Sequence, residues 1–255
     1  MFDINHQTAV GRRLAKASLW VILAAVAWMT AISCGTTASS PSSAASAKPS
    51  ANPLAGLTAD QIVSKATADF KVASSVHVAG WAEDSGQTVA LDLTLGTKGC
   101  AGTLGLQGHG SLLLVQIGQT VWIKLDKQFW KSEGGVSDPT ILQLLAGKYL
   151  QGSVKDSAVS WIEHLCDPRQ FGSLFSGHSN NLLKGKTATI SGQPTLQIKD
   201  ARYLGSAYVT ISASPEFLRL DSRSSGHLDF TGYNVPVVLA PPPADETVNG
   251  AKFGF

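Results

Sequence analysis

The stretch VALDLTLGTKGCAGTLGLQGHGSLLLVQIGQTVWIKL, residues 89–125, decides the fold. In its first part Val89, Leu91, Leu93 and Leu95 share one face of an extended chain, and the residues between them share the other. This period of two indicates a strand with one dry face and one wet face. Short glycine-rich connections require antiparallel hairpins. The pattern predicts strands near 87–95, 101–107, 111–117 and 120–125.

The glycines of this stretch do not form a phosphate-binding loop. Such a loop needs a helix directly after its glycines, whereas the residues after Gly110 (Ser-Leu-Leu-Leu-Val-Gln-Ile117) have the composition of a strand. The glycines are therefore interpreted as turns, bulges and close backbone contacts in a bent sheet.

A helix precedes the sheet. Thr58 and Gln61 have the spacing of a capping box, and a further strand is expected at 76–81. The apolar residues of the expected helix fall on one stripe, and ordinary core packing explains the stripe: Ile62, Val63, Ala66, Phe70 and Ala73.

Helices are expected in the centre of the chain. Asp138-Pro139 and Asp167-Pro168 each combine an N-cap aspartate with a proline at the first helical position. A third apolar segment lies at 158–165. These short helices need an apolar partner, and the dry face of the sheet is the candidate.

Alternation resumes after Gly185, with turn residues between the segments, and Pro241–Pro243 ends the regular structure. The order of helix, strands, helices and strands predicts an α+β domain with a single curved antiparallel β-sheet whose dry face is covered by helices.

The first 34 residues have the pattern of a bacterial lipoprotein signal peptide, cleaved before Cys34. A basic region with Arg12 and Arg13 precedes an uncharged segment. Ala31-Ile-Ser-Cys-Gly35 resembles a lipobox, although Ala31 stands where leucine is usual. The alternative is an uncleaved signal anchor, because residues 17–33 are nearly long enough to span a membrane. Sec export is the default expectation.

The expected organisation continues with a disordered tether at 35–56, rich in Ser, Ala and Pro. A folded domain is expected at 57–248 and a C-terminal tail at 249–255. The tether would hold the domain at the extracytoplasmic face of the cell membrane, through acyl chains on Cys34.

The remaining cysteines, Cys100 and Cys166, are an even pair in an oxidising compartment and are expected to form a disulfide. A metal site or a nucleophilic thiol are the alternatives. A zinc site needs three or four ligands, whereas the segment around Cys166 offers two, the Cys166 thiolate and the His164 imidazole.

Charge and motifs argue against two function classes. After Cys34 the chain carries 17 basic and 17 acidic residues, whereas a nucleic-acid-binding domain normally has a basic excess. The six histidines are scattered, and no hydrolase or metalloprotease motif occurs. We therefore expect no enzyme, no cofactor and no nucleic-acid partner.

The chain resembles actinobacterial lipoproteins of the LppX/LprAFG type. The resemblance rests on the lipobox, the tether, and three segments: Ala73–Val78, Thr120–Trp130 and Leu228–Val237. It implies the half-barrel fold of the LolA/LolB-like lipoprotein carriers, in which helices cover the concave face of the sheet and enclose an apolar cavity. Members of this family bind acyl chains of glycolipids or phospholipids and help to move them toward the outer envelope. Cys34 is the one functional residue that the resemblance carries over.

The resemblance implies a monomeric, lipid-anchored protein that binds acyl chains. The sequence leaves open a filled core of the same residues, in an interaction or envelope-structural module. That alternative predicts an exposed aromatic patch from Trp122, Phe129 and Trp130. The candidate cavity residues are Leu91, Leu93, Leu104, Val115, Ile123, Ile141, Leu145, Ile162, Phe171 and Leu174.

Overall fold

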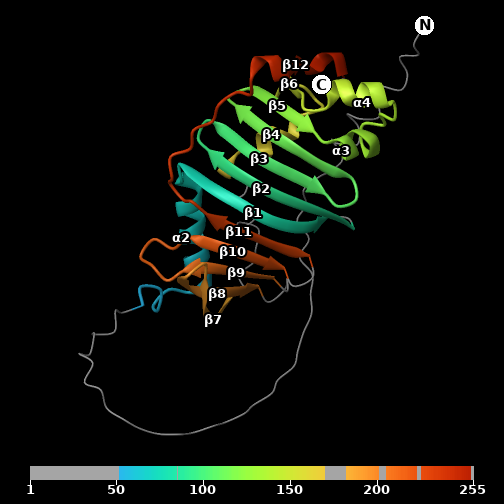
Figure 1. Cartoon of the computed structure of the whole chain (residues 1–255). Coiled ribbons are helices and arrows are strands. Elements are labelled where there is room, and N and C mark those ends of the chain that lie inside the picture. The colour runs from blue at the N-terminus through green and yellow to red at the C-terminus, as the bar shows by residue number, and fades with distance from the viewer. Residues whose placement is uncertain (1–51, 85, 170–181, 201–204, 223–224, 254–255) are drawn as a thin grey trace, which may run out of the picture.

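The structure is a computed structural model, and it describes residues 52–84, 86–169, 182–200, 205–222 and 225–253. Its centre is one open sheet of twelve strands, which is curved and not closed into a barrel (Figure 1). The strands before the helical segment are β1 (Ser75–Asp84), β2 (Gln87–Gly96), β3 (Gly99–Leu106), β4 (Gly110–Ile117), β5 (Thr120–Leu125) and β6 (Tyr149–Ser153). Those after it are β7 (Leu182–Ile190), β8 (Gln193–Asp200), β9 (Gly205–Thr210), β10 (Phe217–Ser222), β11 (Gly226–Thr231) and β12 (Thr247–Asn249).

The sheet joins two ladders of hairpins. Its strand order is β12-β6-β5-β4-β3-β2-β1-β11-β10-β9-β8-β7, so β1 and β11 form the seam between the ladders. The predicted single curved antiparallel sheet is confirmed, except that β12 pairs with β6 in parallel. The expectation that Pro241–Pro243 ends the regular structure is wrong, because β12 follows these prolines. After β11 the chain runs past the ends of the strands to the far edge of the sheet (Figure 1). There β12 lies beside β6 and runs in the same direction.

Four short or medium helices accompany the sheet in the described part of the chain: α2 (Ala59–Val72), α3 (Lys127–Ser132), α4 (Pro139–Leu145) and α5 (Trp161–Leu165). Two 3-10 turns lie near the C-terminus: η2 (Ala244–Glu246) and η3 (Gly250–Phe253).

Helix α2 has the predicted capping box. The Gln61 backbone N–H donates to Thr58 Oγ1, and the Thr58 N–H donates to Gln61 Oε1 at 2.8 Å. Its apolar stripe packs on the sheet at the seam, where the Phe70 ring meets Phe230 edge-on at a centroid distance of 5.6 Å. The residues before the helix also belong to the packed fold, because Leu54 is buried and its carbonyl accepts a hydrogen bond from Lys184 Nζ.

Two of the three central helices, α3 and α4, begin at an aspartate whose side chain caps the helix, whereas α5 has no side-chain cap. Asp138 caps α4, with Pro139 at its first position, as predicted. The apolar segment at 158–165 contains α5. Helix α3, which was not predicted, begins after Asp126. The Asp167 carboxylate accepts a hydrogen bond from the Arg169 N–H, and the rest of the helix expected there lies outside the described residues.

Two glycines allow neighbouring strands to approach where the sheet bends. Gly80 in β1 and Gly102 in β3 have φ values of +146° and +155°. A Cβ at Gly80 would lie 2.1 Å from the His227 carbonyl oxygen, and one at Gly102 would lie 2.0 Å from that of Asp92. No other residue type fits, which confirms the interpretation of these glycines as points of close backbone approach.

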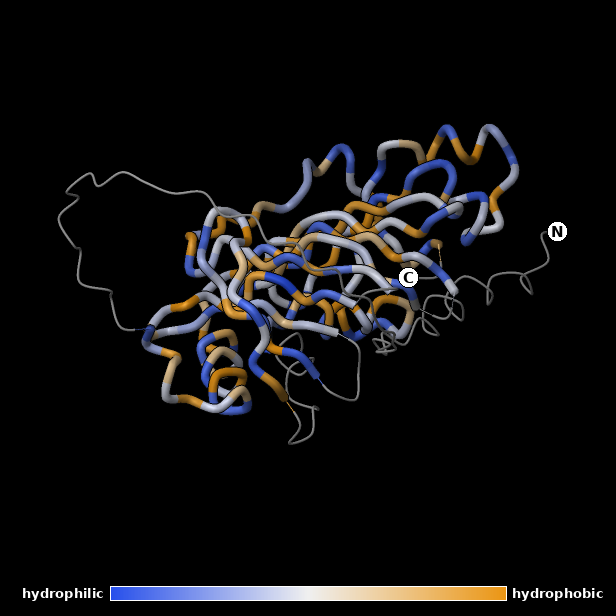
Figure 2. The backbone as a smooth tube through the Cα atoms, turned by 90° about the horizontal axis from the view of Figure 1, so that it is seen from below, coloured by the Kyte–Doolittle hydropathy of each residue, from blue (hydrophilic) through white to orange (hydrophobic). Residues whose placement is uncertain are grey.

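The alternation of hydrophobic and hydrophilic residues along the strands can be followed in Figure 2.

Candidate lipid-binding face

The sheet face that lies toward the helices, here called the inner face, carries three apolar rows that run across the strands. The central row spans seven strands, from β6 to β11. Apart from its glycine, each side chain of this row is at most 2% exposed. The row consists of Leu150, Ile123, Leu114, Gly102, Leu93, Val78 and Phe230.

A second row flanks the central row on one side, and a third flanks it on the other. The second is entirely apolar: Leu125, Leu112, Leu104, Leu91, Gly80, Leu228 and Leu220. The third contains one polar residue: Val121, Gln116, Cys100, Leu95 and Val76. No charged side chain occurs in these rows, which are all described. The inner face is therefore a continuous apolar surface.

Gln116 is the exception in the third row. Its side chain is 7% exposed, and its Nε2 donates to the Gly118 carbonyl at 2.8 Å. The Gln116 Oε1 finds no hydrogen-bond partner among the described residues. A buried carbonyl oxygen without a donor is energetically unfavourable, so this oxygen is available to a donor from a ligand or from water.

Short helices cover the inner face over β3–β6. They contribute Phe129 and Trp130 from α3, Leu142 and Leu145 from α4, and Ile162 and Leu165 from α5, and all six side chains belong to the same buried cluster as the rows. The predicted disulfide between Cys100 and Cys166 is present, with 5.2 Å between the Cα atoms. It ties the C-terminal end of α5 to β3.

The structure brings together six of the ten predicted cavity residues. Four lie in the rows of the inner face and two in the helical cover: Leu91, Leu93, Leu104, Ile123, Leu145 and Ile162. Phe171, Leu174 and the predicted lipidation site Cys34 lie outside the described residues.

Two predicted placements are wrong. Val115 pairs with Ala101 and Trp122 on the opposite face of the sheet. The run Leu112-Leu-Leu-Val is apolar at every position, so alternation did not reveal which residues face inward. Ile141 is 45% exposed on α4, and Leu142 occupies the buried position instead.

Sequence reasoning did not identify the two aromatic residues of α3 as part of the cover, nor the burial of Trp122 on the opposite face of the sheet. Trp122, Phe129 and Trp130 were expected as an exposed patch in the filled-core alternative, but all three are buried. The signal that was available for α3 is Asp126, whose carboxylate accepts from the Phe129 N–H as an N-cap. Phe129 and Trp130, the third and fourth residues of α3, are well placed to pack on the sheet.

The described part of the chain offers neither a metal-binding cluster nor a membrane-spanning helix. It contains no cluster of three or more His, Cys, Asp or Glu residues that could hold a metal ion. None of its helices is long and apolar enough to cross a membrane.

Comparisons with known proteins return alignments with solved structures at low sequence identity. No protein-family model matches the chain, and no curated protein matches it. Among solved structures, LprF from Mycobacterium bovis aligns with a TM-score of 0.48 and 14% identity over 72% of this chain and 96% of that one. An uncharacterized conserved protein from Thermus thermophilus aligns with a TM-score of 0.34 and 9% identity, covering 75% and 98% of the two chains. A DUF1329 family protein from Desulfovibrio piger aligns with a TM-score of 0.22 and 9% identity, covering 71% and 93%.

Proposed function

We propose that this protein is a lipid-anchored lipoprotein of the extracytoplasmic membrane face that binds acyl chains of a lipid or glycolipid and carries it within the cell envelope. The binding site lies between the inner face and its helical cover. The observation that supports the proposal is the set of three apolar rows on the inner face, which contain one polar and no charged side chain.

The dimensions of this face suit an acyl chain. Seven neighbouring strands at a spacing of about 4.8 Å make the central row roughly 29 Å long. Burial of each methylene contributes about 0.8 kcal/mol, so about ten buried methylenes correspond to micromolar binding before the cost of moving the cover is subtracted.

The cover is built so that it can be displaced. Helices α3, α4 and α5 have six, seven and five residues, and helices of this length are not stable without tertiary contacts. An entering acyl chain replaces apolar contacts of α4 with equivalent contacts of its own. Meanwhile the disulfide keeps α5 beside β3.

A second function is favoured by the tight burial of the same residues. Val78, Leu93, Leu95 and Ile162 are fully buried within one cluster, as they would be in a permanently filled core. The protein would then be a non-catalytic interaction or envelope-structural module.

Native mass spectrometry distinguishes the two functions. Full-length protein purified from its own membranes should carry a non-covalent lipid mass in addition to the modification of Cys34. A palmitate analogue with a photoreactive diazirine should label peptides of β2–β5 and α5. Leu113, which is 39% exposed on the opposite face, provides the control: Leu113→Ala should leave the labelling unchanged. Repeatedly lipid-free protein, with labelling confined to the opposite face, would establish the filled core.

The anchor is tested separately. Cys34→Ala should release the protein from membranes into the soluble fraction, because the acyl chains can no longer be attached. If the variant remains membrane-bound, the uncleaved signal anchor is the correct alternative.

A further inference from the structure

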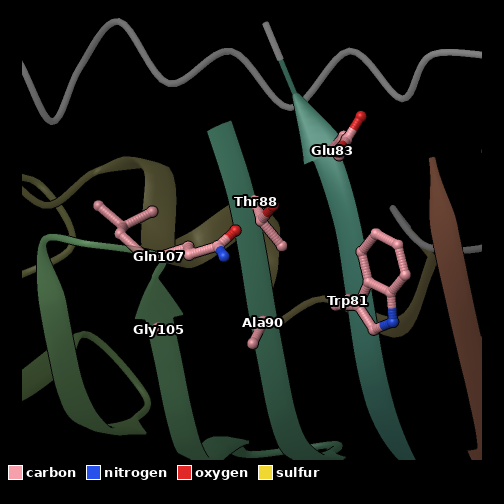
Figure 3. Close-up of a pocket in the computed structure, with 7 residues that line it drawn as sticks. Trp81, Glu83, Thr88, Ala90, Gly105 and Gln107 are labelled. Atoms are coloured by element: carbon pink, nitrogen blue, oxygen red, sulfur yellow. The ribbon is translucent and has the colours of Figure 1, made fainter. Parts of the chain in front are cut away.

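A hollow lies on the face of the sheet that points away from the helices, here called the outer face (Figure 3). Its volume is about 650 Å³. Gly80 and Leu91 belong to the inner face, so their chain neighbours Trp81 and Ala90 point outward. Trp81, Ala90 and Gly105 therefore lie on the face of the sheet opposite the proposed acyl-chain site, and Leu106 at the end of β3 also lines the hollow.

Trp81 forms one wall of the hollow. Its side chain is 37% exposed, which is unusual for so large an apolar group in the middle of a strand. The indole ring is held in place by His227, which it meets edge-on at a centroid distance of 6.2 Å. The indole thus presents a fixed aromatic surface to the solvent.

The floor beside the indole consists of the smallest side chains. Ala90 lies directly opposite Trp81 on β2, and Gly105 lies opposite Ala90 on β3. At Gly105 the backbone has no positive φ, and an added Cβ would lie 3.8 Å from Ala90 Cβ, an ordinary contact. The fold does not require glycine here, in contrast to Gly80 and Gly102. The missing side chain instead leaves space next to the indole.

Uncommitted polar side chains surround this floor. Glu83, Thr88 and Gln107 line the hollow, and none of these side chains forms a hydrogen bond or ion pair with another residue in the described ranges. The rim itself is fixed, because the Gln107 N–H donates to the Thr88 carbonyl and Gln87 Nε2 donates to the Gln107 carbonyl at 2.9 Å. A carboxylate, a hydroxyl, an amide and the indole N–H together offer both donors and acceptors.

We propose that the outer hollow binds a neutral saccharide. A sugar ring has a face of C–H groups that can lie on the indole and a rim of hydroxyls that can pair with the carboxylate, hydroxyl and amide. An acyl chain would leave those polar groups unpaired, and the negative charge of Glu83 disfavours phosphate and other anions. The hollow would hold the protein to a glycan of the envelope, independently of any lipid on the inner face.

The test uses full-length protein in detergent and a panel of oligomers of glucose, mannose, galactose, arabinose and N-acetylglucosamine. Saturation-transfer NMR should show transfer to ring C–H protons of at least one oligomer, and titration calorimetry should then give its affinity. Trp81→Ala should weaken that affinity about tenfold, the size expected for the loss of one aromatic contact.

Two further variants make the result decisive. Gly105→Val should fill the floor and weaken binding by a similar factor while it preserves the melting temperature, because a β-branched residue suits a strand. Leu113→Ala, at a similarly exposed apolar position on the same face, should bind like the wild type.

The proposal is overturned if no oligomer shows transfer, or if both Trp81→Ala and Gly105→Val bind as tightly as the wild type. None of these variants should change the lipid mass in native spectra, so the two proposals fail separately.

Discussion

Asp126 connects the end of β5, the start of β4 and the start of α3 through one carboxylate. Its Oδ1 accepts from the Phe129 N–H at 2.6 Å, and its Oδ2 accepts from the Ser111 N–H and hydroxyl at 2.7 and 2.8 Å. Burial raises the pKa of Asp126, but the hydrogen bonds to the ionised form outweigh burial, and the pKa lies below its ordinary value of 3.8.

Asp126→Ala should lower the free energy of unfolding at pH 7 by about 1–2 kcal/mol, the usual effect of losing an N-cap. Because the pKa is lowered in the folded state, the contribution of the carboxylate is present above the ordinary value of 3.8 and lost as the pH falls through the lower folded value. Urea denaturation at pH 7 and pH 3 should therefore show a smaller difference between wild type and variant at the lower pH. Ser111→Ala, which removes the hydroxyl alone, should cost less at pH 7. An equal loss at both pH values would contradict the argument.

The pKa of Glu216, directly before β10, is shifted in the opposite direction to that of Asp126. Burial, and then the negative charge of Asp69 on α2, raise the pKa of Glu216 above its ordinary value of 4.5. The raised pKa means that the folded state holds this proton more tightly than the unfolded state. The contribution of Glu216 to the free energy of unfolding is therefore greatest below the ordinary pKa of 4.5, and it falls as the pH rises through the pKa of the folded state.

Glu216→Gln should stabilise the protein at pH 7 by a few tenths to about 1 kcal/mol, because it removes first the cost of partly burying a charged carboxylate and then the repulsion with Asp69. The gain should disappear below pH 4.5, the ordinary pKa, where the wild-type carboxyl is also neutral. Thermal melts at pH 7 and pH 4 provide the measurement. A variant that is less stable than the wild type at pH 7 would show that the carboxylate has a stabilising role.

At the scale of elements, α5 depends on its disulfide. The helix has five residues and no side-chain hydrogen bond at its N-cap, so the link between Cys100 and Cys166, 66 residues apart, and the contacts of Ile162 and Leu165 hold it in place. In the chain-entropy account, closing a loop of this length stabilises the fold by on the order of 4 kcal/mol at most.

The double variant Cys100→Ser/Cys166→Ser should lose up to about 4 kcal/mol in urea denaturation without reductant. Lipid exchange should become faster at the same time, because α5 is no longer tied to β3. Thiol labelling of the unreduced, unfolded wild type should find both cysteines blocked. Labelling of either one would refute the disulfide.

At the scale of the whole molecule, the two hairpin ladders unfold together only if the seam between β1 and β11 is intact. Six residue pairs form this seam, from His77–Thr231 to Ala82–Gly226. Gly80 and Gly226 allow the backbones to approach, since a Cβ at either position would lie about 2 Å from a carbonyl oxygen of the other strand.

Gly80→Ala should therefore cost on the order of 3 kcal/mol through backbone strain and a clash, and it should divide a single unfolding transition into two. Circular dichroism and tryptophan fluorescence, followed against urea, should coincide for the wild type and separate for the variant. Gly105→Ala is the matched control, because its Cβ makes only ordinary contacts. Coincident transitions in Gly80→Ala would show that the seam does not couple the ladders.

The sequence predicted the features that depend on neighbouring residues. The capping box at Thr58, the Asp138-Pro139 start of α4 and the alternation in β2 are local patterns with local physical causes, and each is found in the structure. Helix α3 was missed although its cap Asp126 is local, whereas strand β12 was missed because a distant partner holds it. Strand β12 has three residues and is defined by its pairing with β6, about 100 residues earlier in the sequence.

An α+β chain with one curved, mainly antiparallel sheet that buries one face under helices could be predicted from local patterns, because a period of two and helix caps depend on residues close in sequence. Which positions of the run 112–115 face inward, where Ile141 lies and that β1 pairs with β11 became clear from the folded structure alone. These choices depend on which apolar surfaces meet, and an apolar side chain carries no information about its partner until the chain has folded. For the same reason the outer hollow became visible only when three strands placed Trp81, Ala90 and Gly105 side by side.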